Sequence, residues 1–360
     1  MDFELLQRLV EAPGVPSREE AVREFVIEKM RPLVDDIAVD AMGNVIGYKK
    51  GLGGPRVMMA AHMDEIGFLV KHIDDKGFLR LQPLGGFDPR VLGAQRVTVH
   101  GASGDRFPGL LQIAARPPHL STEEERSKAP KVTDLFVDVG MTSEQAKARI
   151  EIGDPVTLER SMMVLGGNIV SKALDNRIAL YVMLEALRTI NAHACEIYAV
   201  ATVQEEIGVR GAVTSAFQVE PEIGIAIDVT LANDIPGQEE RDYISYLGRG
   251  PALKIMDSSA ISDPQIVKQF REVADRHSIP YQLEIAAGVG TDAGGFQRSR
   301  AGVRSFTLSI PCRYVHTVNE TISVADLDNA IYLLTQYLEE AHIIGGNLRH
   351  WQVSEDDQAH

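Results

Sequence analysis

Two patterns of apolar positions alternate along the chain and predict an α/β fold. Apolar residues recur at helical spacing in four stretches, which cover residues 17–30, 175–190, 263–273 and the region after Ser323. Continuous apolar runs of strand length lie at residues 57–61, 197–203, 223–227 and 303–310. Strands buried on both faces give such runs, and helices that alternate with them cover both faces of one sheet. We therefore expect a mixed sheet covered by helices on both faces.

Two of the predicted helices carry a start signal. Ser17 and Glu20 have the spacing of a capping box, in which the hydroxyl and the carboxylate each satisfy a free backbone N–H. Asp263 directly precedes Pro264, which is a typical helix N-terminus. We expect one helix to open at the Ser17 cap and another at the Asp263-Pro264 pair.

A different pattern occupies residues 66–165. Short alternating or apolar runs are separated there by frequent glycine and proline turns, as at residues 67–70, 78–81 and 96–99. Short strands with frequent turns predict a small all-β module. The simplest organisation is an α/β domain made from residues 1–65 and 166–350, interrupted by a barrel-like β-rich insertion. The polar tail at residues 351–360 is expected to be frayed.

Composition excludes several classes of function. The chain has 360 residues, with 36 Lys+Arg against 51 Asp+Glu, for a formal charge of −15. That charge repels nucleic acid and anionic membranes, and no basic patch is evident. The N-terminus lacks the features of a signal peptide, and no apolar stretch approaches ~18–20 residues. We expect a cytoplasmic protein whose two cysteines, Cys195 and Cys312, are buried and reduced.

Isolated His, Asp and Glu residues stand where the apolar runs end. These residues are His62, Asp64, Asp175, Glu205, Glu206, Asp228 and His316. Ligands of open α/β sheets bind outside the carboxyl ends of the strands, so these side chains could converge there. Two imidazoles and several carboxylates form a nitrogen and oxygen ligand set that suits Zn, Co or Mn. The pattern indicates metal-assisted hydrolysis.

Six short motifs around these residues resemble a known family. They occur in the family's order along nearly the whole chain, at residues 61–67, 174–177, 204–208, 227–230, 290–293 and 313–317. The chain resembles the M42 dinuclear metallo-aminopeptidases, which include the glutamyl aminopeptidases and the tetrahedral TET peptidases. The resemblance implies a catalytic α/β domain with an inserted dimerisation domain. It also implies a dimer-based homo-oligomer, in many members a tetrahedral dodecamer.

The resemblance also implies a ligand set for two divalent metal ions in each subunit. Asp175 would bridge the two ions. Glu206 and His316 would complete one site, and His62 and Asp228 the other. Two metals ~3.5–4 Å apart need such a bridging carboxylate, and the water held between them becomes a nucleophile at neutral pH. Zn is the ion we expect first, with Co and Mn as alternatives.

The same resemblance assigns roles to residues that are not metal ligands. Glu205 would be the general base that takes a proton from the water and passes it to the leaving amine. Asp64 would orient His62 by accepting the other imidazole N–H. Gly290, Thr291 and Asp292 would belong to a substrate-facing loop.

Simpler explanations exist for several of these residues. Asp175 could be a helix N-cap, and Glu205-Glu206 a solvated acidic edge. Asp228 could be a turn residue, and the glycine cluster at 288–295 a plain turn. Four cations near the motifs could meet an acidic substrate side chain or could be solvated charges: Arg249, Lys254, Arg298 and Arg300.

The expected activity is removal of N-terminal residues from short peptides by a dinuclear metal-dependent aminopeptidase. Another co-catalytic zinc hydrolase, such as a carboxypeptidase or an N-deacylase, is the alternative, and it would need an arginine to hold a carboxylate. A glycosidase would use two carboxylates without metal. An inactive self-assembling scaffold is the non-enzymatic alternative, although clustered carboxylates without metal would repel one another.

Overall fold

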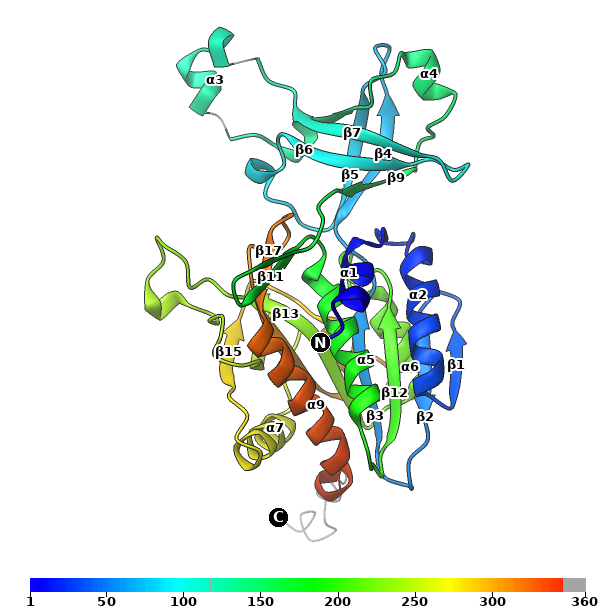
Figure 1. The fold of residues 1–360 in the computed structure, drawn as a ribbon, viewed down its shortest axis with the longest axis vertical. Helices are drawn as coiled ribbons and strands as arrows, with labels where there is room; N and C mark the ends of the chain where they lie inside the picture. Colours follow the sequence, from blue (N-terminus) through cyan, green and yellow to red (C-terminus); the bar gives the residue numbers. More distant parts are fainter. Residues whose placement is uncertain (117, 128, 346–360) are drawn as a thin grey trace, which may run out of the picture.

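The apolar runs form the centre of a large mixed sheet (Figure 1). The computed structural model describes residues 1–116, 118–127 and 129–345. Within this part, the strand order is β1-β2-β12-β3-β13-β16-β17-β11-β10; off this path, β14 pairs with β16, and β15 pairs with β14. The strand bounds are β1 Asp36–Val39, β2 Val45–Lys49, β3 Arg56–His62, β10 Met163–Leu165, β11 Asn168–Ser171, β12 Glu196–Thr202, β13 Ile223–Leu231, β14 Ala252–Asp257, β15 Gln282–Ala286, β16 Arg304–Arg313 and β17 Glu320–Ser323.

Helices cover both faces of this sheet, as predicted. One face carries α1 Phe3–Glu11, α2 Glu20–Met30, α5 Leu174–Thr189, α7 Pro264–Arg276 and α9 Val324–Gly345. The other face carries α6 Arg210–Val219 and α8 Asp292–Gln297. Shorter helices are α3 Glu123–Ser127 and α4 Ser143–Lys147, with 3₁₀ turns η1 Arg31–Leu33, η2 Pro89–Val91, η3 Pro118–Leu120, η4 Val132–Asp134 and η5 Glu240–Asp242. Among the described helices, none combines the length and apolar character needed to span a bilayer.

Strand β3 shows why its sequence is apolar without interruption. Val57 and Met59 belong to the core under α5, whereas Met58 and Ala60 belong to the separate core under α6 and α8. All four side chains are fully buried. Because successive strand residues point to opposite faces, a strand between two helical layers must be apolar at every position.

The central strands open a gap at their carboxyl ends. β3, β12, β13 and β16 run parallel to one another. β3 pairs with β12 as far as His62, but its pairing with β13 ends at Ala226. β13 then continues beside β16 to Leu231. β3 and β13 therefore separate beyond this point, which leaves room between His62 and Asp228.

The predicted capping box at Ser17 is wrong. Helix α2 begins at Glu20, and no side chain caps it. Ser17 has a positive φ of 69° and donates its backbone N–H to the Glu19 carboxylate. That carboxylate also accepts the N–H of Gln204, just before Glu205. The Glu19 carboxylate thus contacts the loop that carries Glu205 and Glu206. Asp263 does cap α7 through two backbone N–H groups.

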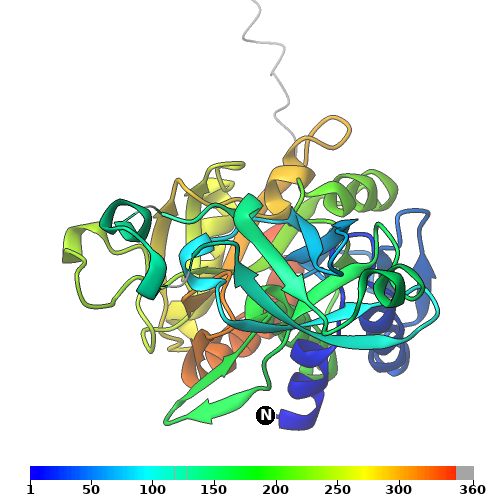
Figure 2. The same cartoon turned by 90° about the horizontal axis from the view of Figure 1, so that it is seen from above.

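The insertion forms a closed antiparallel barrel, which confirms its predicted β-rich, barrel-like fold. Its strands are β4 Gly67–Ile73, β5 Leu79–Leu84, β6 Gln95–His100, β7 Arg106–Ile113, β8 Leu135–Asp138 and β9 Pro155–Leu158, and their order around the barrel is β4-β5-β8-β7-β6-β9. The barrel has its own apolar core. It lies over the end of the α/β domain that carries β11 and β17 (Figures 1 and 2). The predicted tail at 351–360 lies outside the described residues.

Candidate metal centre

The structure brings the predicted ligands together in the gap between the strands. His62 ends β3, and Asp228 lies inside β13, which continues past its predicted end. Asp175 lies at the start of α5, Glu206 in the loop before α6, and His316 in the turn between β16 and β17. All five side chains, with Glu205, line a cavity of about 680 Å³.

Asp175 lies at the centre of this cluster. Its Oδ1 is 3.2 Å from Nε2 of His62, and its Oδ2 is 3.3 Å from Nε2 of His316. Nε2 of His316 is also 3.4 Å from Oε1 of Glu206. Ligand atoms within 4.8 Å of one another form two groups that share Asp175. One group contains His62, Asp175 and Asp228. The other contains Asp175, Glu206 and His316.

The backbone at the start of α5 explains where the Asp175 carboxylate points. Asp175 and Asn176 have non-helical φ and ψ angles, and Ala173 occupies the cap position without a side-chain hydrogen bond. Asp175 therefore does not act as an N-cap. Its carboxylate turns away from the helix and faces the two imidazoles.

Both imidazoles are oriented by backbone carbonyls. Nδ1 of His62 lies 2.9 Å from the carbonyl oxygen of Asp64, and Nδ1 of His316 lies 2.8 Å from that of Gly86. A proton on Nδ1 leaves Nε2 free toward Asp175. Gly86 follows β5 of the barrel, so the insertion contributes directly to the site. The only sign of this in the sequence was a Gly85-Gly86 turn.

The Asp64 carboxylate has a different contact from the predicted one. Its Oδ1 is 3.6 Å from Nδ1 of His62, too far for a hydrogen bond. Instead, its two oxygens accept the backbone N–H groups of Glu205 and Glu206, at 3.0 and 3.1 Å. Asp64 thus fixes the backbone of the acidic pair, while its carbonyl orients His62.

The carboxyl groups of the site are crowded and buried. Burial raises the pKa of Glu205, Glu206 and Asp228 above the usual carboxyl range, and nearby carboxylates add to the effect. For the same main reason the pKa of Asp292 rises to about 6 and that of Glu320 to about 8. Buried like charges are costly unless a cation offsets them.

The chemistry of these donors fits divalent cations. Burial lowers the pKa of both His62 and His316, but their contacts with Asp175 and the negative charges of the other nearby carboxylates outweigh it and raise the pKa. Oε1 of Glu206 is buried without a hydrogen-bond partner among the described residues. A cation would satisfy this oxygen, replace the imidazole protons and relieve the repulsion.

Other predicted residues divide into those in the cavity wall and those outside it. Of the predicted substrate loop, Gly290 lines the cavity, whereas Thr291 and Asp292 are buried beside it and bonded to Asp257 and Thr202. Arg298 also lines the cavity.

The remaining candidate cations lie elsewhere. Lys254 is buried and pairs with Glu284 at 3.2 Å, so it is not a solvated charge. Arg249 stacks on the ring of Tyr246, and Arg300 pairs with Glu220.

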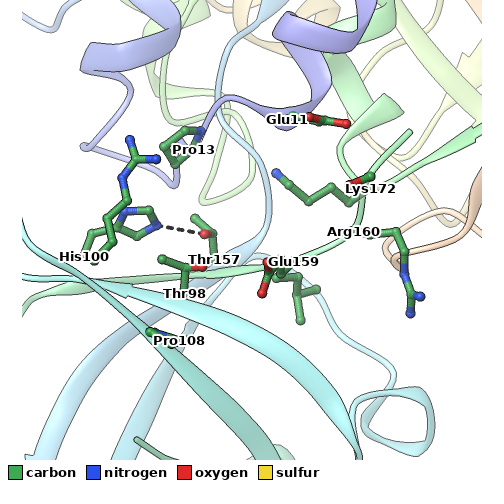
Figure 3. Close-up of a pocket in the computed structure, with 12 residues that line it drawn as sticks. Glu11, Pro13, Thr98, His100, Pro108, Thr157, Glu159, Arg160 and Lys172 are labelled. Carbon is green, nitrogen blue, oxygen red and sulfur yellow. Dashed lines mark hydrogen bonds between the residues drawn. The ribbon is translucent and has the colours of Figure 1, made fainter. Parts of the chain in front are cut away.

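A second hollow of about 270 Å³ lies between the barrel and the α/β domain (Figure 3). His100 and Lys172 line it, but both are already engaged. His100 bonds Thr157, and Lys172 forms a 2.6 Å ion pair with Glu65. None of the predicted site residues lines this hollow.

Comparison with known proteins finds relatives that match nearly the whole chain. The model of the M42 glutamyl aminopeptidase family matches residues 43–333. A lysyl aminopeptidase of Pyrococcus furiosus is 38% identical over 347 residues, which are 94% of this chain and 97% of the relative. The structure of an aminopeptidase from the archaeon Desulfurococcus kamchatkensis has a TM-score of 0.92 at 39% identity, covering 97% of this chain and 98% of that one. The TET1 peptidase of Pyrococcus horikoshii has a TM-score of 0.83 at 32% identity, covering 94% and 99%.

The mixed α/β fold with its barrel and these likenesses define a peptidase hydrolase. The chain belongs to the M42 glutamyl aminopeptidase family.

Proposed function

We propose that this protein is a dinuclear metal-dependent aminopeptidase that removes N-terminal residues from short peptides. The observation that carries the proposal is the position of Asp175, whose two oxygens face two imidazoles at 3.2 and 3.3 Å. Each imidazole belongs to a separate group of ligand atoms, and both groups contain Asp175. A single carboxylate placed in this way suits the bridging ligand of a two-ion site.

The five residues of the two groups would hold the ions, with Zn expected first and Co or Mn as alternatives. When bound, the ions would polarise the scissile carbonyl and lower the pKa of water at the site. The carbonyl contacts at Nδ1 of both imidazoles would leave each Nε2 available to an ion.

Glu205 is the residue that would move the proton. Its carboxylate belongs to neither ligand group, but Oε2 lies 3.9 Å from Nε2 of His62, so it borders the site. Burial raises the pKa of Glu205 well above the usual carboxyl range, which favours proton uptake by this carboxylate. The two N–H bonds to Asp64 hold Glu205 and Glu206 so that they face different partners.

Blocked peptides test the polarity of cleavage. The acidic side chains around Glu205 suit a free α-amine, which N-acetylation makes neutral and bulky. With metal-loaded protein, we expect free peptides to lose residues one at a time from the amino end and their acetylated counterparts to be nearly inert. Mass spectrometry of the digests distinguishes these outcomes. Release from the carboxyl end, or equal cleavage of both peptides, would contradict an aminopeptidase and favour the carboxypeptidase or N-deacylase alternative.

A further inference from the structure

A buried carboxylate outside both ligand groups contacts two of the ligand segments. Glu320 is the first residue of β17 and is only 2% exposed. Its Oε2 accepts the backbone N–H of Asp175 at 2.9 Å, and its Oε1 accepts that of His316 at 2.8 Å. One side chain therefore connects two site residues that lie 141 positions apart in the sequence (316 − 175).

Both of these N–H groups lie in irregular backbone. Asp175 stands at the start of α5, where the first N–H groups of a helix have no partner within the helix. His316 has a positive φ of 63°, a conformation that is strained for a non-glycine residue. Neither segment is held in place by regular secondary structure, so the hydrogen bonds to Glu320 supply that restraint.

Glu320 itself is on a rigid element. β17 pairs with β16 on one side and with β11 on the other, and Glu320 lies opposite Ser171 of β11. β16 leads into the turn that carries His316, and β11 leads into the segment that carries Asp175. The carboxylate is thus located between the two segments that it connects.

The other ligand group is held by separate contacts. The His62 ring is oriented by the carbonyl of Asp64. Asp228 lies within the regular pairing of β13 and β16. Asn176 donates its side-chain N–H to the carbonyl of Ile227 at 2.9 Å, which keeps the Asp175 segment beside Asp228. None of these contacts involves Glu320.

We infer that Glu320 is a positioning residue for one ion site only, the site formed by Asp175, Glu206 and His316. This inference rests on the proposed two-ion function. Without Glu320, His316 and the Asp175 backbone lose their shared restraint, whereas His62, Asp228 and the Asn176 contact remain. The protein should then bind one ion nearly as well as before and the second ion much more weakly.

The test is a titration of the metal-depleted protein with Co²⁺. Calorimetry and visible absorption both measure the binding of the ions. Glu320→Gln keeps the shape of the side chain but has only one acceptor oxygen, so it loses at least one of the two bonds. We expect one Co²⁺ affinity to fall by at least about tenfold (about 1.4 kcal/mol), and the other to stay within about threefold of wild type. Glu320→Asp retains the charge but is too short to reach both N–H groups, and we expect the same selective loss.

Glu185→Gln is the matched control. Glu185 is a buried carboxylate on helix α5, which also carries Asp175, and its side chain bonds Arg188. This variant should bind Co²⁺ as wild type does. Thermal unfolding of the metal-depleted proteins checks that both Glu320 variants remain folded.

The possible outcomes separate this inference from the proposed function. If wild type binds two ions and the Glu320 variants weaken both equally, or neither, the positioning role is wrong and the two-ion site stands. The same conclusion holds if both Glu320 variants fail to fold without metal while Glu185→Gln folds, because Glu320 then has a general structural role. If wild type binds fewer than two ions, both proposals are overturned.

Discussion

The adjacent residues Glu205 and Glu206 have different surroundings because the Asp64 carboxylate fixes their backbone. Glu205 and Glu206 both donate a backbone N–H to Asp64. Only Glu206 belongs to a ligand group, where its Oε1 lies 3.4 Å from the His316 ring. The Glu205 carboxylate instead borders His62 without joining a group. The proposed division between ligand and base therefore depends on the direction of each side chain and not on residue type.

At the scale of single residues, two isosteric variants test this division. Asp175→Asn removes the charge shared by both ligand groups, so it should lower both bound metal and activity. Glu205→Gln removes the proposed base, which belongs to neither ligand group, so it should keep two ions and lower turnover by about 10²–10⁴-fold. Elemental analysis and initial rates of the purified variants measure both effects. Equal metal loss in the two variants would show that Glu205 is itself a ligand.

At the scale of elements, β3 determines both the stability of the α/β domain and the position of His62. It lies between β12 and β13 and contributes to a different core on each face. The loop that carries Glu205 is tied to this strand end, since Met63 donates its N–H to the carbonyl of Thr202. We therefore expect a loss of packing along β3 to lower the free energy of unfolding more than it changes the geometry of the site.

Met58→Ala measures how much the smaller core contributes to the stability of the protein. Met58 is fully buried against the α6 and α8 side of the sheet, so truncation leaves a cavity. We expect the free energy of unfolding to fall by about 2–5 kcal/mol. Chemical denaturation of metal-depleted protein gives this value. Leu52→Ala is the control, since Leu52 is 87% exposed and should change stability by less than about 0.5 kcal/mol. Similar effects of the two changes would contradict a packed second core.

At the scale of the whole molecule, the barrel is both an inserted domain and a part of the site. Gly86, next to its strand β5, binds the His316 ring. A Cβ atom added to Gly85 would lie 3.0 Å from Oε2 of Glu206. Deletion of the barrel would therefore disturb the metal centre, and assembly must be tested with surface variants.

We expect the full-length chain to form a dimer-based oligomer through the barrel. The TET1 peptidase of P. horikoshii can assemble into a tetrahedron or a large octahedral shell. In this chain, Leu110 and Ile152 of the insertion are 51% and 72% exposed, so both apolar side chains are accessible to a second copy of the chain. Light scattering should show an oligomer at micromolar concentration. Leu110→Glu combined with Ile152→Glu should lower its mass, whereas Leu52→Glu on the α/β domain should not. A wild-type monomer would contradict the proposal.

Much of the fold could be predicted because it depends on repeating patterns. A strand buried on both faces must be apolar throughout, and a helix on its surface must be apolar at helical spacing, so both are visible in one sequence. The change to short strands with frequent turns likewise indicated the barrel. The Ser17 capping box failed because Ser17 has a positive φ and the helix begins only at Glu20, while the Glu19 carboxylate accepts the N–H groups of Ser17 and the distant Gln204.

The sequence by itself determined which residue types could hold metal, their order along the chain, and their places near the ends of apolar strands. Only the tertiary structure decided which atoms meet. Asp64 bonds the backbone of Glu205 and Glu206, Gly86 orients His316, and Glu320 connects Asp175 with His316. These contacts join segments far apart in the chain, and hydrogen bonds to backbone groups depend on position in space, so no local pattern of side chains reveals them.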